Sequence, residues 1–73
     1  MAELKIKADV AGRVSALPHA VGAAVTGGED VAVVEAMKME IPVAAPAPGR
    51  IKAILVAVDD MVEEGQALLV IET

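Results

Sequence analysis

The chain has 73 residues, a formal net charge of −5, and no Cys, Phe, Trp or Tyr. Without cysteine it has no disulfide or thiolate metal site, and its six dispersed Lys and Arg form no basic patch for nucleic acid. No stretch approaches the roughly 18 apolar residues of a membrane span, and the charged N-terminus MAELKIKADV is unlike a signal peptide. We expect one soluble, cytoplasmic domain over residues 1–73, with an aliphatic core.

Short strands separated by turn residues run along the chain. Residues 4–7 alternate apolar and polar side chains, as a half-buried strand does. Branched apolar residues indicate further strands at 50–56 and 67–71. The intervening turn signals are Gly12, Gly27-Gly28, residues 46–49, Asp59-Asp60 and Glu64-Gly65. Short strands with frequent turns predict an all-β sandwich or barrel.

Residues 31–41, VAVVEAMKMEI, are ambiguous by themselves because Glu, Ala, Met and Lys all favour helices. The β-branched residues in the first half of this stretch favour a strand, and Pro42 would stop a helix early. We therefore expect a strand ending near Met37, a tight turn over Lys38, and a returning strand from Met39. Pro42 also favours an edge position for the returning strand.

An internal duplication orders these elements. Residues 9–36 align without a gap on residues 46–73, with nine identities in 28 pairs, where composition alone would give roughly three. The identical positions in the first copy are Gly12, Arg13, Ala16, Ala20, Val21, Val25, Gly28, Val33 and Glu35. Two copies this short must pack on one another to bury a face, most simply about a pseudo-two-fold axis. Residues 37–45 then form a connector between the copies.

Catalysis by side chains is poorly supported. The chain has one His, His19, and one Ser, Ser15, and a nucleophile–base pair would need both. We expect His19 to be a surface turn residue and Ser15 an ordinary strand residue. The Asp59-Asp60 pair has no third or fourth ligand spaced around it, so we expect a solvated turn and no metal site.

Lys38 stands out because methionines flank it. Met side chains are flexible and polarizable, and they suit surfaces that partners grip. Exposing Met37 and Met39 around one amine is unfavourable unless a partner covers them. The alternative is an unmodified, solvated Lys38 in a structural or interaction module.

The sequence EAMKME at residues 35–40 resembles the biotin-attachment motif of biotin carboxyl carrier proteins and biotinyl domains. Residues 47–51 and 62–68 are similar to the family's recurrent AP-x-G-x-I/V and V-x-x-G-x-x-L patterns, so the resemblance covers nearly the whole chain. It implies a flattened β-barrel, or sandwich, of two four-stranded antiparallel sheets with quasi-two-fold symmetry. The lysine would stand on a hairpin turn.

The resemblance also implies a function. Lys38 would be biotinylated by a biotin protein ligase, and the chain would be a non-catalytic biotin carboxyl carrier. It would move a carboxyl group between a biotin carboxylase and a carboxyltransferase of the acyl-CoA carboxylase type. The residues implied in ligase recognition are Ala36, Met37, Met39 and Glu40.

Glu40 is preferred to Glu35 for recognition because Glu35 has a counterpart in the second copy, Glu72, and is therefore expected to belong to the scaffold. The sequence departs from the family pattern at one turn, where Gly22-Ala23 stands in place of the usual Gly-Asp. We expect an altered turn there. The initiating Met and the complete pair of repeats favour a free-standing carrier.

A lipoyl carrier is the main alternative. Lipoyl domains of 2-oxoacid dehydrogenases and glycine-cleavage systems share the implied fold and hairpin lysine, and a dual biotin/lipoyl attachment protein would combine both roles. Lipoyl motifs usually have Asp-Lys-Ala at the tip, whereas this chain has Met-Lys-Met. The sequence therefore favours biotin.

Overall fold

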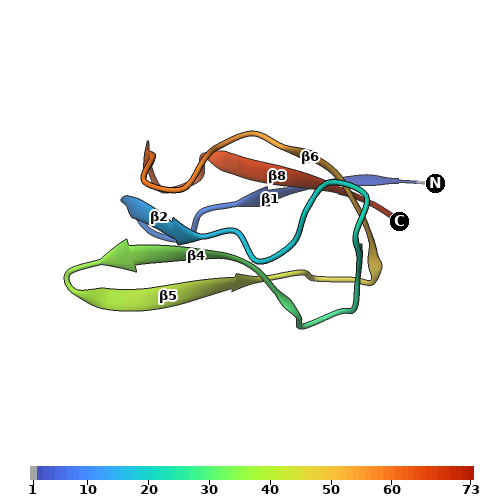
Figure 1. Cartoon of the computed structure of the whole chain (residues 1–73), viewed down its shortest axis with the longest axis horizontal. Helices are drawn as coiled ribbons and strands as arrows, with labels where there is room; N and C mark the ends of the chain where they lie inside the picture. The colour runs from blue at the N-terminus through green and yellow to red at the C-terminus, as the bar shows by residue number, and fades with distance from the viewer. Residues whose placement is uncertain (1) are drawn as a thin grey trace.

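Two four-stranded antiparallel β-sheets make up the protein in the computed structural model, which describes residues 2–73 (Figure 1). The strands are β1 (Glu3–Lys7), β2 (Gly12–Ala16), β3 (Ala24–Val25), β4 (Asp30–Ala36), β5 (Met39–Ala44), β6 (Gly49–Ile54), β7 (Met61–Val62) and β8 (Ala67–Glu72). One sheet has the order β1-β8-β6-β3 and the other the order β5-β4-β2-β7. The predicted all-β fold is confirmed. Within the described residues no helix is long and apolar enough to cross a membrane.

The two sheets are related by the internal duplication. Adding 37 to the residue numbers of β2, β3 and β4 gives β6, β7 and β8 to within one residue at each end, and β1 corresponds to β5 in the same way. Exchanging each strand for its counterpart converts one sheet order into the other. The expected quasi-two-fold symmetry is therefore confirmed, but residues 37–45 are more than a connector. They contain β5, the counterpart of β1.

The core between the sheets is built from branched aliphatic side chains. The largest fully buried ones are Ile51, Leu68, Leu69, Ile71, Val14, Val31 and Val34. Duplicated positions supply much of this set, since Val14 corresponds to Ile51 and Val34 to Ile71. Every residue described as buried is apolar, so the core contains no buried polar or charged side chain in the described range.

A glycine in each copy allows a close backbone approach. A Cβ on Gly12 would lie 2.3 Å from the carbonyl oxygen of Glu35, and a Cβ on Gly49 would lie 2.6 Å from that of Glu72. Any other residue would push the neighbouring strand away. The Gly and Glu identities in the repeat therefore mark the points where β2 meets β4 and β6 meets β8.

The ambiguous stretch 31–41 forms the strand–turn–strand unit that the sequence predicts. Residues Asp30–Ala36 are strand β4, which pairs with β2 on one side and β5 on the other. Pairing on both sides buries Val31, Ala32 and Val34 and outweighs the local preference for a helix. Strand β5 lies at the edge of its sheet, as its proline predicts.

The turn that departs from the family pattern keeps its backbone geometry. Gly22 and its counterpart Asp59 both have left-handed φ values, 93° and 79°. The Ala23 N–H donates to the Ala20 carbonyl at 3.1 Å, as the Asp60 N–H does to the Ala57 carbonyl. The expected alteration of this turn therefore does not extend to its backbone. The second-copy turn does have an additional side-chain hydrogen bond, in which the Ala57 N–H donates to Asp60 Oδ2 at 2.9 Å.

Candidate functional site

The β4–β5 hairpin presents Lys38 at its tip. Ala36 pairs with Met39, so Met37 and Lys38 form a two-residue turn. Their φ values are 52° and 65°, which is the pattern of a type I′ turn. Such turns favour Asn-Gly, because a left-handed conformation costs other residues about 1–2 kcal/mol each. Met37 and Lys38 therefore form a tight turn with a strained backbone.

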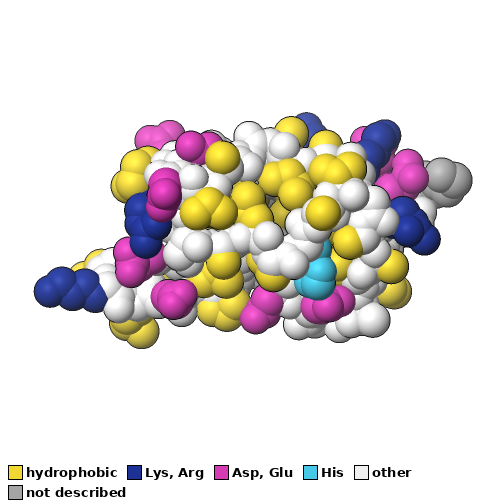
Figure 2. All heavy atoms as spheres, in the orientation of Figure 1, with side chains coloured by type: hydrophobic (Ala, Val, Ile, Leu, Met, Phe, Trp, Pro, Cys, Tyr) yellow, Lys and Arg dark blue, Asp and Glu magenta, His cyan; other side chains and the backbone are white. Residues whose placement is uncertain are grey.

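The hairpin tip exposes two methionines. Met37 is 95% exposed, the highest value among the large hydrophobic residues that the structure describes, and Met39 is 65% exposed. The hairpin extends past the neighbouring strand β2, at the end of the molecule opposite to the chain ends (Figure 1). In Figure 2 a basic side chain projects from this end with hydrophobic side chains beside it. Within residues 2–73, Lys38 has no ion pair and no side-chain hydrogen bond.

Two glutamates face each other at the base of this tip. Glu35 of β4 lies directly opposite Glu40 of β5 in the strand register. Arg13 of β2 lies on the other side of Glu35 and donates to Glu35 Oε1 at 3.1 Å and to Asp59 Oδ1 at 2.5 Å. Its hydrogen bond to Glu35, reinforced by Asp59, holds the pKa of Arg13 above its usual value. Glu40 has no ion pair in the described part of the chain.

The same glutamate pair recurs at the opposite end of the molecule. Glu3 of β1 lies opposite Glu72 of β8. Lys52 forms an ion pair with Glu3 and lies 4.0 Å from Glu72, and its hydrogen bond to Glu3 raises the pKa of Lys52. Glu40 therefore does have a counterpart, Glu3, and the sequence argument that separated it from Glu35 is wrong. The two pairs differ because one cation, Lys52, lies beside both carboxylates at the terminal end, whereas Arg13 contacts only Glu35 of the pair near the tip, within the described residues.

The residues set aside for catalysis have structural contacts. His19 Nε2 lies 3.3 Å from Glu29 Oε2, and Ser15 donates to the Val33 carbonyl at 3.3 Å. Asp59 pairs with Arg13, while Asp60 accepts from the backbone of its own turn. Among the described residues there is no group of three or more potential metal ligands and no pocket.

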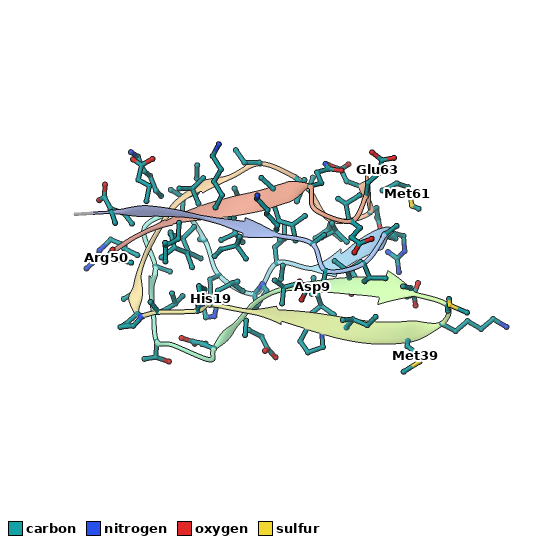
Figure 3. The ribbon with its side chains drawn as sticks, turned by 180° about the vertical axis from the view of Figure 1, so that it is seen from behind. Asp9, His19, Met39, Arg50, Met61 and Glu63 are labelled. Carbon is teal, nitrogen blue, oxygen red and sulfur yellow. The ribbon has the colours of Figure 1, made fainter. Side chains whose placement is uncertain are left out.

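Sequence reasoning missed two residues near the tip. Arg13 appears in the repeat, but its contact with Asp59, 46 residues away, exists only in the folded chain. Met61 is 72% exposed on strand β7. Figure 3 shows it at the same end of the molecule as Met39, with Arg50 at the opposite end. The sequence does contain one indication of Met61, because the aligned residue in the first copy is Ala24.

A family model and a curated relative indicate the same family. A biotin/lipoyl family model, described as "Biotin-requiring enzyme", matches residues 15–71. A "Biotin/lipoyl attachment protein" of Bacillus subtilis (strain 168) is 45% identical over 42 residues, which are 58% of this chain and 58% of that protein. The chain thus spans little more than half of this curated relative.

Two solved structures extend this similarity to nearly the whole chain. A single-chain, multi-domain long-chain acyl-CoA carboxylase is 37% identical with a TM-score of 0.88, covering 93% of this chain and 7% of that one. The urea carboxylase of Kluyveromyces lactis is 35% identical with a TM-score of 0.92, covering 99% of this chain and 6% of that one. In both, the matching part is a small fraction of a large protein.

Proposed function

The chain belongs to the biotin/lipoyl attachment family, and from this membership we propose that it is a biotin carrier domain, residues 1–73, acylated on Lys38. One observation supports the proposal most. Lys38 stands on a strained two-residue turn beside a methionine that is 95% exposed. A merely solvated lysine needs neither the strain nor the exposed apolar surface. Both are useful if another protein must grip the turn and reach the amine.

The Lys38 amine fits covalent attachment, because no ion pair or side-chain hydrogen bond within residues 2–73 holds it back. In the proposed reaction a biotin protein ligase uses ATP to make biotinyl-adenylate. The neutral Lys38 Nζ attacks the acyl carbon, an amide bond forms, and the bond to the phosphate oxygen breaks to release AMP. A free lysine amine is protonated at neutral pH, so a ligase base must take up its proton. Acylation changes the formal net charge from −5 to −6.

The residues around the turn would serve recognition. Met37 and Met39 offer exposed apolar contacts, and the short Ala36 side chain leaves the base of the turn open. Glu40 offers a carboxylate that no cation of the described chain neutralises, so it suits a basic group on the ligase. The tight turn holds these groups in one arrangement, so little order is lost on docking.

The carrier role would require two further partners. We propose a biotin carboxylase and a carboxyltransferase, as in an acyl-CoA carboxylase, and the similarity to two carboxylases supports both. Bound biotin would supply the nitrogen that accepts and gives up the carboxyl group. The chain itself would hold the attachment point on a firm hairpin, remote from Ala2 and Thr73, and would catalyse nothing alone. We expect this in the cytoplasm, where ATP is available to the ligase.

Lipoylation is the second candidate, because the Bacillus subtilis relative is named for both groups. It would use the same Lys38 amine and the same kind of amide bond. The Met-Lys-Met tip and the similarity to two carboxylases both favour biotin. A dual attachment protein would accept either group at the one site.

Intact-mass spectrometry of the protein from its native host tests the proposal directly. We expect one biotinyl increment, located on Lys38 by peptide mapping and absent from a Lys38→Arg variant. A Lys52→Arg variant is the matched control, since Lys52 is also exposed but lies in strand β6 and pairs with Glu3. A lipoyl mass increment on Lys38 would reject the biotin carrier and support the lipoyl carrier. No increment in the host, together with no labelling by purified ligase, biotin and ATP, would reject both.

A further inference from the structure

The duplicated fold provides an internal comparison for every exposed side chain. Val21 and Val58 occupy corresponding positions and are 60% and 49% exposed, so both copies have the same exposed apolar residue there. Met61 differs, because it is 72% exposed while its counterpart is Ala24 on strand β3. Both strands are two residues long and pair with the equivalent strand of their sheet. The fold therefore accommodates an alanine at this position and does not require the methionine.

Met61 lies on the sheet that carries Lys38. In the strand register Met61 pairs with Arg13, which pairs with Glu35, which in turn pairs with Glu40. Residues paired in this way project from the same face of a sheet. Two strand spacings separate Met61 from Glu35, or about 10 Å between backbones. Figure 3 shows Met61 and Met39 at the same end of the molecule, and they belong to the two edge strands of this sheet.

The surroundings of Met61 are also unlike those of its counterpart. The turns on either side of β7 contain four carboxylates, whereas the corresponding positions on either side of β3 contain none. The four acidic residues are Asp59, Asp60, Glu63 and Glu64, and their counterparts are Gly22, Ala23, Thr26 and Gly27. The backbone is thus repeated, but the exposed methionine and its flanking acidic turns belong to the second copy and have no equivalent in the first.

We propose that Met61 is an apolar contact for the biotin protein ligase that acylates Lys38, and that basic groups of the ligase face the surrounding carboxylates. The inference rests on the proposed function. A standard protein interface covers about 800 Å² on each partner, which is large enough for a ligase at the hairpin tip to reach both edge strands of this four-stranded sheet. Asp59 already pairs with Arg13, but Glu63 and Glu64 have no ion pair within the described residues, so an exposed methionine beside them suits an apolar pocket edged with Lys or Arg.

Steady-state biotinylation with purified ligase, ATP and biotin tests the inference. Met61→Ala, which installs the residue of the other copy, is expected to raise the KM for the carrier about five- to tenfold with kcat unchanged. Met61→Leu should stay within about twofold of the parent protein, because it keeps the apolar volume. Ala24→Met is the matched control at the far end and should change neither constant. Urea unfolding should show the same midpoint for Met61→Ala and the parent protein.

The outcomes separate this inference from the proposed function. If the parent protein is labelled on Lys38 and Met61→Ala has an unchanged KM, the Met61 contact is rejected and the proposed function stands. The contact is also rejected if Ala24→Met alters KM as much as Met61→Ala does, or if kcat alone falls. If the parent protein is not labelled by the ligase at all, both proposals fail. A KM effect seen only with a carboxylase subunit would assign Met61 to that partner and overturn the inference.

Discussion

Glu40 lies directly opposite Glu35 on neighbouring strands, and within the described residues only Glu35 has a cation beside it. Like charges facing each other across a strand pair are destabilising. The corresponding pair in the other sheet, Glu3 and Glu72, has Lys52 beside both carboxylates. The protein therefore relieves this repulsion at one end and leaves it partly unrelieved next to the hairpin tip. We propose that this difference keeps the Glu40 carboxylate available for a partner.

Replacing Glu40 by Gln should stabilise the fold while weakening recognition. Removing the repulsion is expected to raise the free energy of unfolding by about 0.2–0.5 kcal/mol, measured by urea denaturation. The same variant should raise the KM for biotinylation several-fold, because it loses the contact proposed for a basic ligase group. Glu3→Gln is the control, and it should not stabilise the fold, since it removes the partner of Lys52. Equal stability gains from both variants would refute this account of the pair.

The duplicated glycines should be intolerant of any side chain. A Cβ at Gly12 or Gly49 would lie 2.3 Å or 2.6 Å from a carbonyl oxygen of the next strand, far inside normal contact. We expect Gly12→Ala and Gly49→Ala each to lower the free energy of unfolding by about 1–3 kcal/mol. Gly27→Ala is the control, because its nearest neighbour would lie at 3.7 Å. Thermal or urea unfolding should show that Gly12→Ala and Gly49→Ala are less stable than Gly27→Ala. A loss of stability in Gly27→Ala as large as in Gly12→Ala would contradict this explanation.

Much of the fold was readable from the sequence because the two copies specify the same strands. The duplication predicted the pseudo-two-fold axis, and β-branched residues with Pro42 predicted the β4–β5 hairpin. The alignment of residues 9–36 on residues 46–73 nevertheless leaves out an earlier part of the repeat. At the same offset, residues 3–8 match residues 40–45, with Ala8 and Ala45 both buried. Extending it would have revealed β5 as the counterpart of β1.

Other features of the site could not be read from the chain. The contact of Arg13 with Asp59 joins residues 46 apart, and its existence depends on how β2 and the turn before β7 come together. The exposure of Met61 is equally a property of the folded state, because a methionine at that position in the sequence is compatible with the core. The sequence predicts Lys38 and its neighbours as the attachment site from a local motif, and this stays a prediction. It could not identify residues brought to that end by tertiary structure.

Restoring the missing aspartate in the first-copy turn should stabilise the protein. Asp60 Oδ2 accepts a hydrogen bond from the Ala57 N–H at 2.9 Å, and the equivalent residues, Ala23 and Ala20, have the same backbone bond without a side-chain acceptor. Ala23→Asp should therefore raise the free energy of unfolding by about 0.5–1.5 kcal/mol. Asp60→Ala should lower it by a similar amount, as measured by urea unfolding. No gain from Ala23→Asp would mean that the two turns are not energetically equivalent.

Relieving the strain in the hairpin turn should improve stability. Met37 and Lys38 both have positive φ values, and an Asn-Gly pair adopts this turn more readily. The double variant Met37→Asn/Lys38→Gly is expected to raise the free energy of unfolding by about 1–2 kcal/mol while losing all labelling. Met37→Asn alone should gain less, keep Lys38 as an acceptor, and be labelled with a higher KM because an apolar contact is gone. Lys38→Arg should match the parent protein in stability but should not be labelled. Its lack of labelling would then be due to the missing lysine amine. If Met37→Asn is no more stable than the parent, the turn is not strained and its left-handed residues need another explanation.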